Sequence, residues 1–177
     1  MNKLLISVFF LFFLLLTIYV YPASPDFPKP LPGSIQSTEP ADTETPLRRG
    51  YFTNLSRQEV IEHYEREFNV NQLRYKGFKF YAPRLNYPPE EAPALIRDQT
   101  KSTFLEEITH PLRESLYING FEPKSEEYAQ FYKGIRYNQR IIVRYVPSFV
   151  FNRIIILGLT LVAVLVLIRE YKYIKNV

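Results

Sequence analysis

The chain contains no cysteine and no tryptophan, and its 177 residues include only two histidines and six glycines. Without cysteine, disulfides, thiolate zinc sites, iron–sulfur clusters and thiol catalysis are all excluded. The glycines never adopt the GxGxxG or GxxxxGK[ST] spacing of nucleotide-binding loops, and HExxH does not occur either. The sequence therefore carries no motif for nucleotide binding, thiol chemistry or zinc-dependent proteolysis.

Charge is also modest. Lys and Arg number 22 against 18 Asp and Glu, and the net charge of +4 is spread along the chain. Such a distribution does not indicate nucleic acid as a partner. Once two apolar runs and a proline-rich stretch are set aside, roughly 100 residues remain, which is enough for one small domain with its own core.

The first apolar run is Leu4–Val20, preceded by Lys3 as in a signal peptide. The sequence after it, YPASP, is a poor cleavage site, because cleavage after Ala23 would put the bulky Tyr21 at the −3 position. We therefore expect residues 1–21 to be a retained transmembrane anchor rather than a cleaved signal.

The second apolar run is Phe149–Ile168, which we expect to be a transmembrane helix. Its uncharged core, Ile154–Ile168, would reach only about 22 Å, so the residues before it must contribute to the span. Arg153 is then expected near one interface, with its guanidinium extended to the lipid headgroups. A functional arginine within the membrane is the alternative.

Both ends of the chain are short and basic: Lys3 flanks the first run, and the tail 169–177 holds Arg169, Lys172 and Lys175. Because positive flanks stay in the cytoplasm, we expect an integral plasma-membrane protein with both termini cytoplasmic and an extracytoplasmic central domain. The basic residues before the second run argue for the opposite orientation, but long translocated domains largely escape this rule.

Between the two runs, residues 22–46 hold seven prolines among small and polar residues, which predicts an extended, disordered linker. Residues 47–146 are expected to form the folded domain. No linker separates this domain from the second run, so that run should hold the domain close to the bilayer.

Within the domain, Ser56 and Glu59 predict a capping box at the start of a helix over 56–68. In the last strand, Ile141, Val143 and Tyr145 should share one face. Further predictions are strands over 47–53, 72–82, 103–109 and 114–119, the last closed by Asn119-Gly120, and a short helix over 87–99. We expect a small α+β domain, one antiparallel or mixed sheet covered by one or two helices, between two transmembrane helices.

Catalytic candidates are weak. Glu59, His63 and Glu67 recur every four residues on the predicted helix and could bind a metal or transfer protons, but ion pairs with neighbouring arginines explain the same spacing. His110 and Ser115 form a second pair, without the strained turn that activates a serine. No metal site and no cofactor is predicted.

Basic and aromatic residues alternate before and inside the second run. We expect contact with anionic lipid or with a partner through Arg136, Arg140, Arg144, Arg153, Tyr137 and Tyr145. The alternative is a solvated strand face that protects a sheet edge.

Together these features predict a membrane-anchored, non-enzymatic module that presents an extracytoplasmic α+β domain to a protein or envelope partner. Its expected partners are the lipid bilayer and another membrane or envelope protein, not nucleic acid. A membrane-tethered hydrolase or transferase and a two-span accessory subunit of a larger complex remain alternatives.

Overall fold

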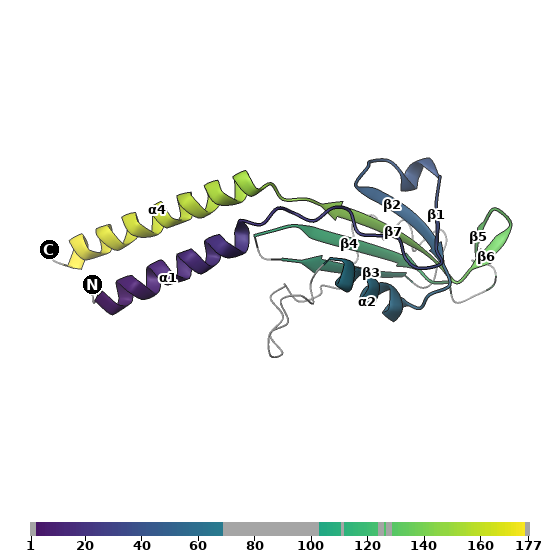
Figure 1. Cartoon of the computed structure of the whole chain (residues 1–177), viewed down its shortest axis with the longest axis horizontal. Coiled ribbons are helices and arrows are strands. Elements are labelled where there is room, and N and C mark those ends of the chain that lie inside the picture. The colour runs from purple at the N-terminus through teal and green to yellow at the C-terminus, as the bar shows by residue number, and fades with distance from the viewer. Residues whose placement is uncertain (1–2, 69–102, 111, 124–125, 127–128, 176–177) are drawn as a thin grey trace. The chain divides into compact units, whose positions relative to one another are not determined.

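The computed structural model describes residues 3–68, 103–110, 112–123, 126 and 129–175 (Figure 1). These residues belong to two compact units. The first comprises residues 1–24 and 148–177, and the second is Pro25–Pro147. The predicted strand over 72–82 and helix over 87–99 lie outside the described residues.

The second unit is built on a five-stranded antiparallel sheet, which confirms the α+β class. Its strand order is β1-β2-β7-β4-β3. In that order the strands are Ile35–Gln36, Arg48–Thr53, Gln139–Val146, Ser115–Phe121 and Thr103–Thr109. The strands predicted over 47–53 and 103–109 are confirmed as β2 and β3.

Helix α2 (Arg57–Glu67) packs on one face of this sheet. The predicted capping box is present: Ser56 Oγ accepts from the Glu59 backbone N–H, and the Glu59 carboxylate accepts from the Ser56 N–H at 2.8 Å. The sheet contributes alternate residues, so the predicted Ile141, Val143 and Tyr145 face is confirmed. The core comprises Leu31, Tyr51, Val60, Ile61, Tyr64, Phe68, Phe104, Ile108, Leu116, Ile118, Ile141, Val143 and Tyr145.

The turn predicted at Asn119-Gly120 is wrong, because both residues lie inside β4. Gly120 pairs with Phe104 of β3, and a Cβ at this glycine would lie 2.0 Å from the Phe104 ring. Asn-Gly favours a hairpin turn by local chemistry alone. Here the glycine instead provides the space that an aromatic ring on the neighbouring strand occupies.

Residues 25–46 are not the disordered linker that their composition predicts. They belong to the second unit, where β1 pairs with Tyr51 and Phe52 of β2 and Leu31 is 2% exposed in the core. The Phe27 ring lies 4.2 Å from the Arg49 guanidinium carbon. A few well-spaced apolar side chains bind this segment to the sheet, and its prolines reduce the entropy lost on ordering.

A separate hairpin joins β5 (Gln130–Tyr132) to β6 (Ile135–Tyr137). Its two turn residues, Lys133 and Gly134, have φ angles of 50° and 77°, as a type I′ turn requires. Sequence analysis did not identify this hairpin. The 3₁₀ helix η1 (Pro40–Asp42) lies between β1 and β2 in the chain.

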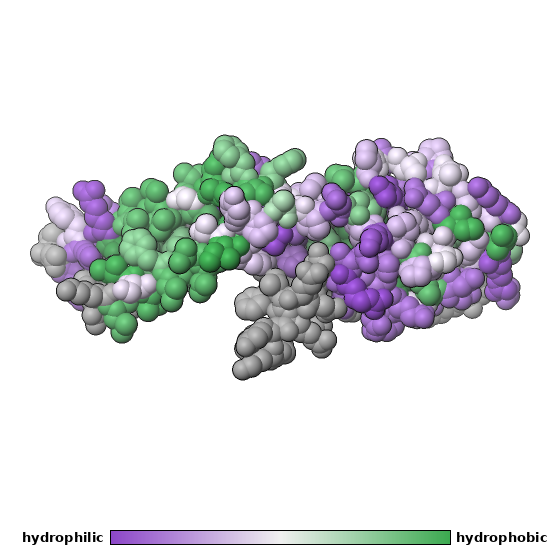
Figure 2. All heavy atoms as spheres, in the orientation of Figure 1, coloured by the Kyte–Doolittle hydropathy of each residue, from purple (hydrophilic) through white to green (hydrophobic). Residues whose placement is uncertain are grey.

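The first unit contains α1 (Lys3–Val20) and α4 (Val150–Lys175), which lie side by side in Figure 1. In the described part of the chain, α4 alone is long and apolar enough to cross a membrane, judged by length and composition; the apolar part of α1, Ile6–Val20, is shorter. All of the predicted span 149–168 except Phe149 falls within α4, but the helix continues through the basic residues to Lys175. Hydrophobic side chains cover both helices in Figure 2.

Candidate functional site

The structure gives Glu59, His63 and Glu67 separate partners. Glu59 serves the capping box, whereas His63 is 7% exposed and its Nε2 lies 3.0 Å from the Lys29 carbonyl oxygen. Glu67 Oε2 is 4.0 Å from Lys29 Nζ. No cluster of three or more metal-ligating side chains occurs among the described residues.

The Glu59 carboxylate supports a prediction about pH. Hydrogen bonds from the Ser56 hydroxyl and backbone N–H lower the pKa of Glu59. This pKa is lower in the folded state than in the unfolded state. The ionised Glu59 side chain therefore stabilises the folded state at pH values above the unfolded pKa, and this contribution is lost as pH falls through the folded pKa. Replacing Ser56 with alanine should raise the pKa of Glu59 towards its ordinary value, as measured by NMR titration in detergent micelles.

Ser34→Ala is the matched control, since the Ser34 hydroxyl donates to the Leu31 carbonyl and not to Glu59. It should leave the pKa of Glu59 unchanged. An unaltered Glu59 titration in Ser56→Ala would contradict the capping assignment.

His110 and Ser115 flank the turn between β3 and β4. The His110 backbone N–H donates to the Glu114 carbonyl, and the buried His110 ring lies 5.6 Å from the Phe68 ring. Ser115 pairs with Thr109 and Val146 at the end of its strand. The turn and the contact with Phe68 thus hold His110, and strand pairing holds Ser115.

The structure separates the six predicted lipid- or partner-contact residues. Arg136 forms an exposed ion pair with Glu126 at 2.8 Å, and Arg140 donates to Glu39 at 2.6 Å and to Asp42 at 2.7 Å. Asp42 is fully buried, so Arg140 neutralises a carboxylate inside the fold.

The two tyrosines of the set are also structural. Tyr137 packs against Phe52, with ring centroids 5.7 Å apart. Tyr145 lies on the core face, and its hydroxyl donates to the Pro25 carbonyl at 2.7 Å. Neither aromatic ring is displayed for a ligand.

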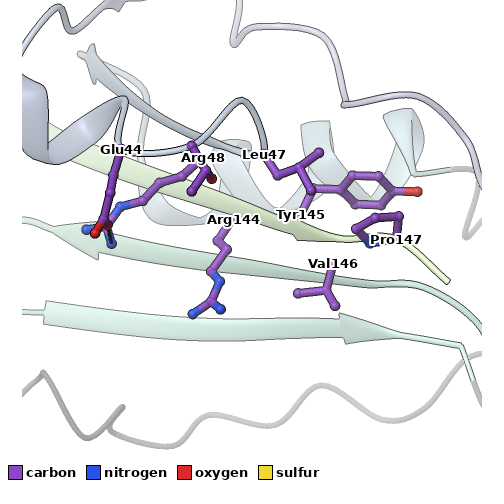
Figure 3. Close-up of a pocket in the computed structure, with 8 residues that line it drawn as sticks. Glu44, Leu47, Arg48, Arg144, Tyr145, Val146 and Pro147 are labelled. Atoms are coloured by element: carbon purple, nitrogen blue, oxygen red, sulfur yellow. Dashed lines mark hydrogen bonds and ion pairs between the residues drawn. The ribbon is translucent and has the colours of Figure 1, made fainter.

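Arg144 is exposed on the opposite face of the sheet. It lies directly opposite Arg48 in the β2–β7 ladder, beside a groove of about 500 Å³ (Figure 3). We call this the Arg48–Arg144 groove. It is lined by Glu44, Thr45, Leu47, Arg48, Arg144, Tyr145, Val146 and Pro147.

The groove has a surplus of positive charge. Like charges directly opposite each other in a sheet are destabilising. Arg48 Nη1 is 3.3 Å from Glu44 Oε2, but the Glu44 side chain is 67% exposed, so this ion pair is weak. In Figure 3 Arg48 is turned towards Glu44 and Arg144 points away from it. No ion pair within the described residues involves Arg144.

Comparison with protein-family models, curated proteins and solved structures gives no match for this chain. The role of the groove must follow from its own chemistry. Two guanidinium groups with one exposed carboxylate favour an anionic ligand, because each guanidinium can bind a phosphate or carboxylate through two parallel hydrogen bonds.

Arg153, the last of the predicted contact residues, lies in the first unit and is 4% exposed. Its Nη1 donates to the carbonyls of Val20 at 2.8 Å and Pro22 at 3.0 Å, where α1 ends. Its Nη2 donates to Ser24 Oγ at 3.0 Å and to the Ser148 carbonyl at 2.6 Å.

The expected extension of Arg153 to lipid headgroups is therefore corrected. The last carbonyls of a helix lack intrahelical donors, and the helix dipole makes that end negative. A buried guanidinium satisfies several of these acceptors at once. No local signal could have revealed this role, because Val20 and Arg153 are far apart in the sequence.

Proposed function

We propose that this chain is a membrane-anchored, non-enzymatic binding module that presents its α+β unit to a protein or envelope partner outside the cytoplasm. The observation that carries the proposal is the β5–β6 hairpin. It displays two large apolar side chains, Phe131 at 61% and Ile135 at 53% exposure. In the hairpin register Phe131 lies opposite Arg136 and Ile135 lies opposite Tyr132, so the two side chains belong to its two faces. Large apolar side chains exposed on one ordered element are typical of binding surfaces.

The hairpin is held in place by contacts of its two tyrosines. The Tyr132 ring stacks on Phe52 with centroids 4.6 Å apart, and Tyr132 and Tyr137 are both buried with Phe52 in one cluster. The Tyr132 hydroxyl also lies 2.8 Å from Thr38 Oγ1. Because these contacts fix the hairpin, Phe131 and Ile135 would lose little conformational entropy on binding, which favours affinity. The exposed Lys133 beside them suits a partner with acidic residues around an apolar pocket.

Anchoring is proposed through both helices of the first unit, with both basic ends in the cytoplasm. Phe13, Val20 and Leu157 form a cluster between α1 and α4, and Arg153 bonds to the end of α1. Cleavage after Ala23 would remove two of the four acceptors that Arg153 uses, the carbonyls of Val20 and Pro22. These contacts support a retained first helix that spans the membrane beside α4.

Of the alternatives, a tethered hydrolase gains no support from the described candidates, each of which has a structural role. A two-span accessory subunit would instead contact its complex through the helices. The test below distinguishes that case, because Leu159 of α4 is 65% exposed and provides a reporter within the helix.

The test is site-specific photo-crosslinking in intact cells. A benzophenone amino acid at Phe131 should give one adduct of defined mass, and Ile135→Ser should abolish that adduct. The same probe at Gln58, which is exposed on α2, is the matched control and should give none. Adducts from position 159 alone would indicate the accessory-subunit function, and adducts from 131 and 58 alike would contradict the proposed surface.

Sidedness is measured in the same cells, since the chain has no cysteine of its own. Ala41→Cys and Tyr173→Cys each introduce one exposed thiol. A membrane-impermeant maleimide should label position 41 and not position 173. Labelling at 173 alone would invert the proposed orientation.

A further inference from the structure

We infer that the Arg48–Arg144 groove binds the phosphate of an acidic phospholipid headgroup. This inference rests on the proposed membrane anchoring through α4, but not on the hairpin or on the side of the membrane. Its ligand and its residues differ from those of the partner surface.

The first argument is charge. Arg48 and Arg144 repel each other across one register position, and an anion between or beside them would relieve that repulsion. Arg48 Nε is buried and has no hydrogen-bond partner among the described residues. Glu44 is the ion-pair partner recorded for Arg48 among the described residues, and this pair is largely exposed, so the guanidinium has capacity for a further anionic ligand.

The second argument is the apolar rim. Leu47 is 38% exposed and Val146 is 39% exposed, and both line the groove. A phospholipid offers apolar glycerol and acyl groups next to its phosphate, whereas inorganic phosphate offers none. The combination of guanidinium groups and aliphatic side chains therefore matches a lipid better than a free anion.

The third argument is the covalent tether. Arg144 lies six residues before Val150, where α4 begins. A fully extended chain spans at most about 3.5 Å per residue, so the two Cα atoms are never more than about 20 Å apart, however the two units are oriented. Headgroup layers extend roughly 5–8 Å beyond the hydrocarbon on each side. The short tether thus limits how far Arg144 can lie from the first turn of α4.

An acidic peptide could also bind two guanidinium groups. The tether favours lipid, because lipid headgroups, unlike a free peptide, are always present beside an inserted α4, to which Arg144 is joined by a short segment. The other arginines of the predicted set already have partners within the protein. Arg136 and Arg140 are paired with carboxylates, and Arg153 is buried against carbonyls.

The experiment measures lipid binding to the full chain in non-ionic detergent by native mass spectrometry. Short-chain phosphatidylglycerol should bind, and phosphatidylcholine should bind much more weakly. Replacing both arginines, in R48Q/R144Q, should weaken phosphatidylglycerol binding by at least about tenfold. R144Q alone should give a smaller loss in the same direction.

The matched control is K29Q/R66Q, which removes two positive charges at exposed positions outside the groove. It should stay within about twofold of the wild type, because its charges are solvated and distant from the ligand. Equal losses in both double variants, or no loss in R48Q/R144Q, would overturn the inference. Far-UV circular dichroism of the variants verifies that the sheet is intact.

Two further arms identify the ligand source. Glycerol phosphate that competes as well as the lipid would show a free-phosphate site, and an acidic peptide that displaces the lipid at lower concentration would show a protein site. Either result would overturn the lipid assignment. Flotation of the chain with phosphatidylcholine vesicles reports anchoring separately, so its failure would reject the anchoring proposal rather than the groove residues.

Discussion

Replacing Arg153 with methionine is expected to lower the free energy of unfolding of the first unit by about 3 kcal/mol. The methionine fills much of the same volume but donates no hydrogen bonds. The carbonyls of Val20 and Pro22 would lose a charged donor at a site that is 4% exposed. Hydrogen bonds to charged groups contribute about 1.5–3 kcal/mol each, and leaving buried acceptors without a donor adds a desolvation cost.

Two measurements follow this change. Unfolding in a mixed-micelle detergent titration gives the free energy, and hydrogen exchange reports the last turn of α1. The Tyr21 N–H, which donates to the Thr17 carbonyl, should exchange faster once the end of the helix frays. Arg153→Lys should lie between the wild type and the methionine variant, because an ammonium has fewer donors than a guanidinium.

Arg169→Met makes the same chemical change at an exposed position of the same helix. It should change the free energy of unfolding by less than about 0.5 kcal/mol. Equal stability of the Arg153→Met and Arg169→Met proteins would show that Arg153 does not connect the two helices. The support for a retained α1 would then rest on the apolar cluster alone.

Replacing Gly120 with alanine is expected to destabilise the second unit by about 3 kcal/mol. The new methyl group would lie 2.0 Å from the Phe104 ring, far inside van der Waals contact. Phe104 is 7% exposed and packs in the core, so its ring cannot move without opening a cavity or distorting β3. Urea unfolding of the full chain, followed by circular dichroism, measures the loss.

A second substitution at the contact tests the cause. Phe104→Leu in the Gly120→Ala background should recover part of the lost stability, because leucine lacks the ring atoms that collide. Gly134→Ala is the control: its φ is 77° with open space around the Cβ, so only backbone strain of about 1 kcal/mol is expected. A Gly120→Ala protein that unfolds at the wild-type urea concentration would contradict the role of this glycine.

Helix α2 and strand β7 could be predicted from sequence because their signals are local. Ser56 and Glu59 are three residues apart, and a capping box needs nothing beyond them. Along β7, alternation alone assigns Ile141, Val143 and Tyr145 to one face. The apolar composition of α4 is equally local, which is why its place in the chain was found although its end was not.

The arginines could not be sorted in this way. Arg136, Arg140 and Arg144 lie at four-residue spacing and look equivalent in the sequence. The structure distinguishes them because their partners come from distant segments: Asp42 for Arg140, and Glu126 for Arg136. Strand pairing then places Arg144 opposite Arg48, which creates the groove.

The sequence by itself determined the class of the fold, the start of α2, the faces of β7 and the apolar character of both terminal helices, since each depends on residues within a few positions of one another. Tertiary structure alone decided that Phe27 and Leu31 bind a proline-rich segment to the sheet. It also decided that Gly120 makes room for a ring and that Arg153 caps α1. The physical reason is the same in each case: the decisive contact joins residues that only chain folding brings together, and burial makes its absence costly.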